Sequence, residues 1–204
     1  LAWLYDEDRG PSGAAGGLVT RDSNEFRARN LLFTDMPGTQ SKANEGRNNG
    51  NLRNGDGQLI ACYDIVLDGD GYLSSYKRIG ENDDAEGRKW YAYVEISKPS
   101  HWYNDGTYVD TLNPDAIKKF IAVTHERYKE TVGDEFDKTV PAIFTDEPQV
   151  VGKKTLKNSF DTNCDVILPW TDALPEKYKK QYGADILDTL PELIWDTHNV
   201  SVAR

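Results

Sequence analysis

The sequence contains few cysteines, no long apolar run and fewer basic than acidic residues. Its two cysteines, Cys62 and Cys164, lie far apart and form no CxxC pair, so the pattern indicates neither a zinc site nor a disulfide framework. No segment approaches the roughly 20 apolar residues of a membrane span. The formal net charge of −10, from 34 acidic and 24 basic residues, repels a phosphate backbone. We therefore expect neither nucleic acid nor a membrane as a partner.

Several catalytic motifs are also missing. The chain contains no GxSxG, GxGxxG, GxxxxGK[ST] or HExxH. Serine-hydrolase, dinucleotide-binding, phosphate-loop and zinc-protease functions therefore lack their usual sequence anchors.

The residues that are present predict a folded chain. Of the 204 residues 38% are hydrophobic and 11% aromatic, more rings than a disordered chain carries. This length suits one domain over residues 1–204. The chain enters an apolar run at its first residue without a Met, so we expect it to be part of a longer polypeptide.

Short apolar runs and turn residues set out a series of elements. Residues 38–88 are expected to form an insertion: a Gly- and Asn-rich loop, followed by a hairpin of strands 58–67 and 72–79 joined by Asp68-Gly69-Asp70-Gly71. The acids of this turn could suggest calcium, but without the Glu that ends an EF-hand loop the pattern favours a plain hairpin. Further strands are predicted at 2–5, 26–34, 89–97 and 139–144, and helices at 113–133 and after 172.

The segment from Lys89 to Phe144 predicts a strand, a helix and a second strand. Asn113 is the expected helix cap and Pro114 the first helical residue. This unit builds parallel sheets. The fold class expected is α/β, as part of a (β/α)-barrel of the TIM type that carries the hairpin insertion.

Two of the predicted strands end directly in carboxylates, at Asp6-Glu7-Asp8 and at Asp146-Glu147. The carboxyl ends of strands are where active sites lie in α/β sheets and barrels. Glycoside hydrolysis uses two carboxyl groups, one as proton donor and one as nucleophile or base. Glu147 is the first catalytic candidate, and Asp146 would orient it or bind substrate.

Other interpretations of these acids stay open. Each cluster is also typical of a solvated loop. Alternatively Asp6, Glu7 or Asp8 could contribute oxygen ligands to calcium.

Aromatic residues supply candidates for sugar stacking, because a pyranose ring presents apolar C–H faces. Trp102 and Tyr103, followed by Asn104, lie in a polar segment and suit substrate binding, whereas Trp90 on the apolar face of a strand is expected in the core. His125 is predicted to be an ordinary residue on the polar side of its helix.

Three stretches together resemble a known family. They are Trp3-Leu4-Tyr5-Asp6-Glu7-Asp8-Arg9 with Pro11-Ser12-Gly13, then Tyr108-Val109-Asp110-Thr111, and finally Phe144-Thr145-Asp146-Glu147-Pro148. They resemble bacterial glycoside hydrolases of family 106, the α-L-rhamnosidase-like enzymes. This implies a (β/α)-barrel with flanking β domains, catalysis by glutamates and, in some members, calcium.

Carried over by motif, the resemblance makes Glu7 and Glu147 catalytic, without assigning acid or base, and adds Asp6, Asp8 and Asp110 to the substrate-binding candidates. Gly10 stands where a Trp is expected, which removes one stacking ring. Only about four of the eight barrel strands fit in the chain, so we expect activity to need the rest of a longer polypeptide. Bacterial cytoplasm, periplasm and secretion all remain open as compartments.

The leading hypothesis is a fragment of a glycosidase, with an α-L-rhamnoside as one substrate. The alternative is a non-catalytic carbohydrate-binding module that uses Trp102 and Tyr103 as its platform. A third is an interaction segment whose acids face bulk solvent.

Overall fold

The computed structural model describes residues 1–37, 57–150 and 152–198, which belong to two compact units. Leu1–Arg29 with Ile96–Val151 form the first, here the carboxylate unit, and Asn30–Glu95 with Gly152–Arg204 form the second, here the sheet unit. In the described part of the chain, no helix combines the length and apolar character needed to cross a membrane.

The carboxylate unit contains a two-stranded parallel sheet. Strand β1 (Leu4–Tyr5) pairs with β6 (Ile143–Phe144), with Leu4 opposite Ile143 and Tyr5 opposite Phe144. Short 3-10 turns occur at Asn24–Phe26, His101–Tyr103 and Gly133–Glu135.

The predicted helix at 113–133 is present but divided in two. Helix α1 (Pro114–Val123) begins as expected, with the Asn113 side chain accepting from the Asp115 amide. Helix α2 (His125–Val132) follows after a break at Thr124. The Thr124 hydroxyl donates to the Phe120 carbonyl at 2.6 Å, a local bond that competes with the helical ladder and bends helices.

A small apolar core supports the carboxylate unit. It joins α1 to the segments around residues 14–28 and 108–109. Its buried members are Ala14, Val19, Ala28, Tyr108, Val109, Ala116 and Phe120.

The sheet unit is built on five strands in the order β4-β3-β5-β2-β7. These are β2 (Arg29–Thr34), β3 (Gln58–Leu67), β4 (Leu73–Ile79), β5 (Arg88–Ile96) and β7 (Asp165–Trp170). Strand β3 pairs antiparallel with both β4 and β5. The predicted hairpin is therefore confirmed, and Asp68 accepts the amides of Asp70 and Tyr72 within its turn.

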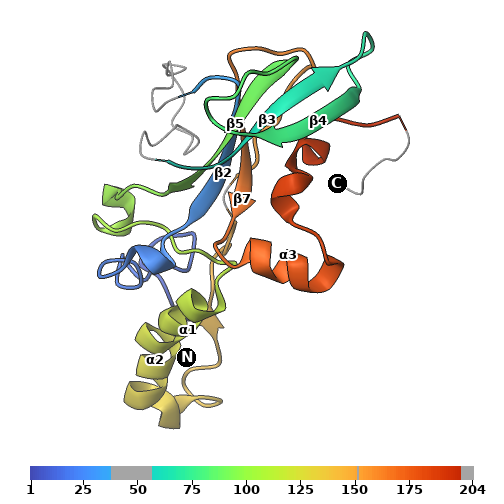
Figure 1. Ribbon diagram of the computed structural model, residues 1–204. Coiled ribbons are helices and arrows are strands. Elements are labelled where there is room, and N and C mark those ends of the chain that lie inside the picture. The colour runs from blue at the N-terminus through green and yellow to red at the C-terminus, as the bar shows by residue number, and fades with distance from the viewer. Residues whose placement is uncertain (38–56, 151, 199–204) are drawn as a thin grey trace. The chain divides into compact units, whose positions relative to one another are not determined.

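Helical segments after β7 complete the sheet unit and are labelled or coloured red in Figure 1. Helix α3 (Leu174–Tyr182) ends at Gly183, which adopts a φ of 74° as a left-handed cap. Two 3-10 turns follow at Ile186–Asp188 and Leu190–Leu193.

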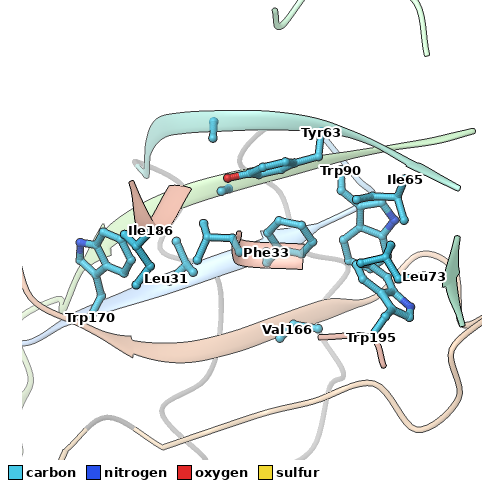
Figure 2. Packing of buried hydrophobic residues seen from close by; sticks show 13 residues of the cluster. Leu31, Phe33, Tyr63, Ile65, Leu73, Trp90, Val166, Trp170, Ile186 and Trp195 are labelled. Carbon is cyan, nitrogen blue, oxygen red and sulfur yellow. The ribbon is translucent and has the colours of Figure 1, made fainter. Parts of the chain in front are cut away.

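Large aromatic rings dominate the core of the sheet unit (Figure 2). Phe33 stacks on Trp90 with centroids 5.2 Å apart, and Trp195 meets Trp90 edge-on at 5.0 Å. The expectation that Trp90 is a core residue is confirmed, since its side chain is fully buried. This packing ties the C-terminal turns to the sheet.

The predicted α/β class with a TIM-like (β/α)-barrel is wrong. The five-stranded sheet is mostly antiparallel, and the described ranges contain three α-helices, too few to surround a barrel. The strand, helix and strand between Lys89 and Phe144 do exist, but β5 and β6 lie in different sheets. The helices between them therefore link two sheets and do not cross over one.

The predicted insertion at 38–88 is described only in part. Residues 38–56, the expected loop, lie outside the described residues. The hairpin that follows supplies two adjacent strands of the five-stranded sheet.

Candidate functional site

The parallel pairing of β1 and β6 brings the two acidic segments together. Both strands run in the same direction, so Asp6-Glu7-Asp8 and Asp146-Glu147 leave the sheet at the same end. The Asp6 amide continues the ladder by donating to the Phe144 carbonyl at 3.3 Å. The expectation that both clusters lie at carboxyl ends of strands agrees with this geometry.

Asp6 is the buried centre of this site, with a fully enclosed carboxylate. It accepts from the hydroxyls of Ser12 and Thr145, each at 2.7 Å, and its Oδ2 lies 3.2 Å from Nε2 of His125. These partners come from the loop after β1, the end of β6 and the start of α2. A buried charge is tolerated only when it is paired and hydrogen-bonded. Asp6 therefore needs all of these partners, and its contacts hold the three segments together.

Glu7 is also buried, but its carboxylate interacts with backbone amides. It accepts from the N–H groups of Ala15 and Gly16, which adopt φ values of 49° and 59°. Successive amides in such a turn form a concavity suited to an anion. Burial raises the pKa of the Glu7 carboxyl, and these amide bonds oppose the rise.

Asp146 is fixed by contacts on both its backbone and its side chain. Its amide donates to the Ser12 hydroxyl at 2.8 Å, and its carbonyl accepts the Ser12 amide at 2.6 Å. Its carboxylate accepts from the Tyr5 hydroxyl at 3.1 Å. A side chain at position 10 would displace this carboxylate from its present place.

Tyr5 is a suitable hydrogen-bond donor for Asp146. Burial, followed by the hydrogen bond to Asp146, raises the pKa of the Tyr5 phenol. The phenol therefore stays protonated and can donate at neutral pH.

Glu147 differs from the other acids because its side chain is exposed and its backbone is strained. Its φ is 42°, in the left-handed region that costs a non-glycine residue roughly 1 to 2 kcal/mol. No hydrogen bond or ion pair to its carboxylate occurs among the described residues. Strain of this kind collects at functional sites, so the conformation favours a functional role for Glu147.

The exposed residues Asp8 and Arg9 form a weak pair at the rim, with 3.5 Å between the charged groups. The guanidinium of Arg9 also lies over the Trp102 ring, 5.4 Å from its centroid. Asp8 is therefore at the same strand end as Asp6 and Glu7 but faces solvent.

Trp102 lies next to the two acidic segments. Its indole Nε1 donates to the Gly10 carbonyl at 2.9 Å, and the residue remains 52% exposed. The backbone of Gly10 in turn lies beside the carboxylate of Asp146, since a Cβ at position 10 would clash with it. The predicted platform residue thus supplies an accessible aromatic face within the candidate site.

The other predicted binding residues have mainly structural contacts. Tyr103 packs against Tyr108 in the core of the carboxylate unit, with centroids 5.5 Å apart. Asn104 ends a 3-10 turn with a φ of 52°. Asp110 is buried, and its carboxylate accepts the Leu112 amide in the turn before α1. Burial, followed by the charges of Tyr108 and Glu7, raises the pKa of the Tyr103 phenol, so Tyr103 also lies within electrostatic range of Glu7.

The sequence analysis missed Ser12, Thr145 and His125. His125 was predicted to be ordinary, yet its ring contacts Asp6. Ser12 and Thr145 belong to the stretches that resemble family 106. A hydroxyl residue close to an acidic cluster was the one feature of the sequence that could have identified them. Their importance comes from a shared partner, which no local pattern reveals.

The acids form no metal centre in the described part of the chain, where no group of three or more His, Cys, Asp or Glu is arranged to hold an ion. Asp6 and Glu7 direct their oxygens to hydroxyl and amide donors of the protein itself. The described residues therefore provide no set of ligands that supports the calcium hypothesis.

A pocket of about 370 Å³ adjoins the buried side of the site. Leu4 lines it from β1, Asp6 from the residue that follows this strand, and Tyr128, whose hydroxyl donates to the Tyr5 carbonyl, from α2. The remaining lining residues are Val123, Thr124, Arg127, Thr131 and Val132.

Comparisons with known proteins identify no relative: no family model matches the chain, and neither a curated protein nor a solved structure is significantly similar to it.

Proposed function

We propose that the protein is a carbohydrate-active hydrolase that cleaves a glycosidic bond with carboxyl groups at the paired ends of β1 and β6. The observation that carries this proposal is the parallel register of these strands, which puts Glu7 and Glu147 at one end of the sheet. Glycoside hydrolysis needs two carboxyl groups in different environments. A buried Glu7 and an exposed Glu147 meet that requirement.

The environments suggest the division of labour. Burial raises the pKa of the Glu7 carboxyl, which is the direction expected for the group that donates a proton to the leaving oxygen. Glu147 is exposed and held at a fixed, strained backbone position, which suits the carboxylate that attacks the sugar or activates water. Asp146, held by Tyr5 and Ser12, is the substrate-binding neighbour.

The substrate proposed first is an α-L-rhamnoside. The resemblance of the three motifs to family 106 supports this choice, and the exposed face of Trp102 offers a surface for the apolar side of a deoxysugar.

A second candidate, carbohydrate binding without catalysis, is favoured by one observation. The Glu7 carboxylate already accepts amides of its own chain, so it acts there as a structural group. In that case Trp102 carries the binding and no carboxylate is essential.

The test is hydrolysis of a panel of nitrophenyl glycosides, α-L-rhamnoside included, by the wild type and by Glu147→Gln, each assayed as the full-length protein. We expect Glu147→Gln to lower kcat by about 10²- to 10⁴-fold with an unchanged unfolding midpoint, because the side chain is exposed. The matched control is Glu126→Gln, which removes an exposed glutamate from α2 of the same unit and should leave kcat unchanged.

Two results would contradict the proposal. Full activity of Glu147→Gln would remove that residue from catalysis. If no glycoside is cleaved but sugars bind, and Trp102→Ala abolishes binding, the carbohydrate-binding function replaces hydrolysis.

A further inference from the structure

A second pocket lies within the sheet unit and shares no lining residue with the candidate site. It has a volume of about 230 Å³. Strands β3 and β5 form one wall, and Phe160 with Trp195 forms another. The lining residues are Ile65, Val66, Leu67, Gly87, Arg88, Trp90, Phe160 and Trp195.

The pocket contains a buried hydrogen-bond donor that has no acceptor. Trp90 is fully buried, and its Nε1 has no hydrogen-bond partner among the described residues. Figure 2 shows the nitrogen-bearing edge of the Trp90 indole directed to the end of the core where Ile65 and Trp195 lie. Leaving a buried N–H unpaired costs free energy, so a ligand that supplies an acceptor would recover it.

Arg88 adds a positive charge at the same wall. Its Nη1 donates to the Asp161 carbonyl at 2.7 Å, and in the described ranges no carboxylate lies within ion-pair distance of its guanidinium. Arg78 on the neighbouring strand β4, in contrast, pairs with Asp185 and Asp188. Arg88 therefore keeps donors for an external anion.

The rest of the wall is apolar. Ile65 and Trp195 are each 2% exposed, whereas Phe160 is 47% exposed and leaves the pocket accessible. Pockets for drug-sized ligands measure about 300 to 1,000 Å³, so this smaller volume suits a single ring with a short substituent.

We infer that this pocket binds a small aromatic carboxylate. The ring packs on Ile65, Phe160 and Trp195, and the carboxylate accepts from the Trp90 indole and pairs with Arg88. This site does not depend on the proposed hydrolase activity, which uses residues of the carboxylate unit.

The experiment is a titration with benzoate, followed by the indole N–H signals of the five tryptophans in ¹⁵N-labelled protein. The Trp90 signal is assigned by its loss in Trp90→Phe. We expect this signal to shift saturably. Arg88→Met should weaken binding about tenfold, the effect of losing a charge-assisted hydrogen bond, and uncharged benzyl alcohol should bind about tenfold more weakly than benzoate.

Two variants complete the test. Arg78→Met, which removes an arginine already paired with acids, should leave benzoate binding unchanged. Leu67→Trp should abolish binding by filling the pocket. This variant keeps Trp90, so the Trp90 signal can still be followed. An unmoved Trp90 signal up to the solubility limit, or equal weakening by Arg78→Met and Arg88→Met, would overturn the inference.

Discussion

The two units of this protein are stabilised in different ways. The sheet unit is built around large buried rings, with Phe33, Trp90 and Trp195 in mutual contact. In the carboxylate unit the core is smaller, and the strand ends are joined by hydrogen bonds to the buried Asp6.

The two kinds of interaction have different consequences for the structure. Apolar packing is non-directional and tolerates many sequences, whereas a buried carboxylate with fixed partners specifies one geometry. The exposed and strained Glu147 lies beside such a network. We infer that the polar network positions the carboxylates of the candidate site, while the aromatic core stabilises the sheet unit.

The largest expected effect tests the aromatic core. Trp90→Ala should lower the free energy of unfolding by about 3 to 5 kcal/mol, because it leaves a cavity among buried rings. Urea unfolding measures the loss, and hydrogen exchange should rise in β3 and β5. The control Trp3→Ala removes an indole that is 70% exposed and should change stability by less than about 0.5 kcal/mol. Equal losses in both variants would refute the role given to Trp90.

The next effect concerns the polar network. Asp6→Ala should cost about 2 to 4 kcal/mol, because Ser12 and Thr145 lose a buried acceptor. Hydrogen exchange should increase at β1 and β6 but not in the sheet unit. Asp8→Ala is the control: this neighbouring acid is exposed and pairs only weakly, so its loss should be nearly neutral. A neutral Asp6→Ala would show that the network does not hold the strand ends.

A smaller effect of opposite sign is expected at Glu147. Glu147→Gly should raise the free energy of unfolding by about 1 kcal/mol, because glycine adopts a φ of 42° without strain. Gln149→Gly, in the same exposed segment without a positive φ, should instead be destabilising by up to about 1 kcal/mol. If Glu147→Gly is also destabilising, the strained backbone is not a feature of the folded protein.

The smallest effect is a pH dependence that comes from Glu7. Burial raises its folded pKa above the ordinary 4.5, so the folded state binds the proton more tightly than the unfolded state. The stabilisation of the folded state from this proton is complete below about pH 4.5 and is lost as the pH rises through the raised pKa of Glu7. Urea midpoints measured from about pH 4 to about pH 7 should fall less steeply in Glu7→Gln than in the wild type. Parallel profiles would contradict the raised pKa.

Local features of the fold could be predicted from the sequence. The hairpin between Gln58 and Ile79, the cap at Asn113 and the burial of Trp90 follow from turn chemistry, capping and alternation. The position of the carboxylates at strand ends could be predicted because two apolar runs stop directly at acidic residues.

The arrangement of the strands could not be predicted in the same way. Alternation in residues 88–96 identifies a strand but not the sheet it joins, so β5 and β6 were assigned to one parallel unit although they lie in separate sheets. His125 was missed for a related reason: its contact with Asp6 joins residues 119 positions apart, and helical periodicity carries no information about such a partner.

The most direct test of the proposed catalysis is chemical rescue of Glu147→Gly by azide. If Glu147 supplies the carboxylate that attacks the sugar or activates water, Glu147→Gly is inactive toward the glycoside that the wild type cleaves, and azide restores turnover by bonding to the anomeric carbon as the aglycone leaves. A glycosyl azide product is the predicted result. An active Glu147→Gly, or an inactive variant that binds substrate but yields no azide adduct, would contradict this account.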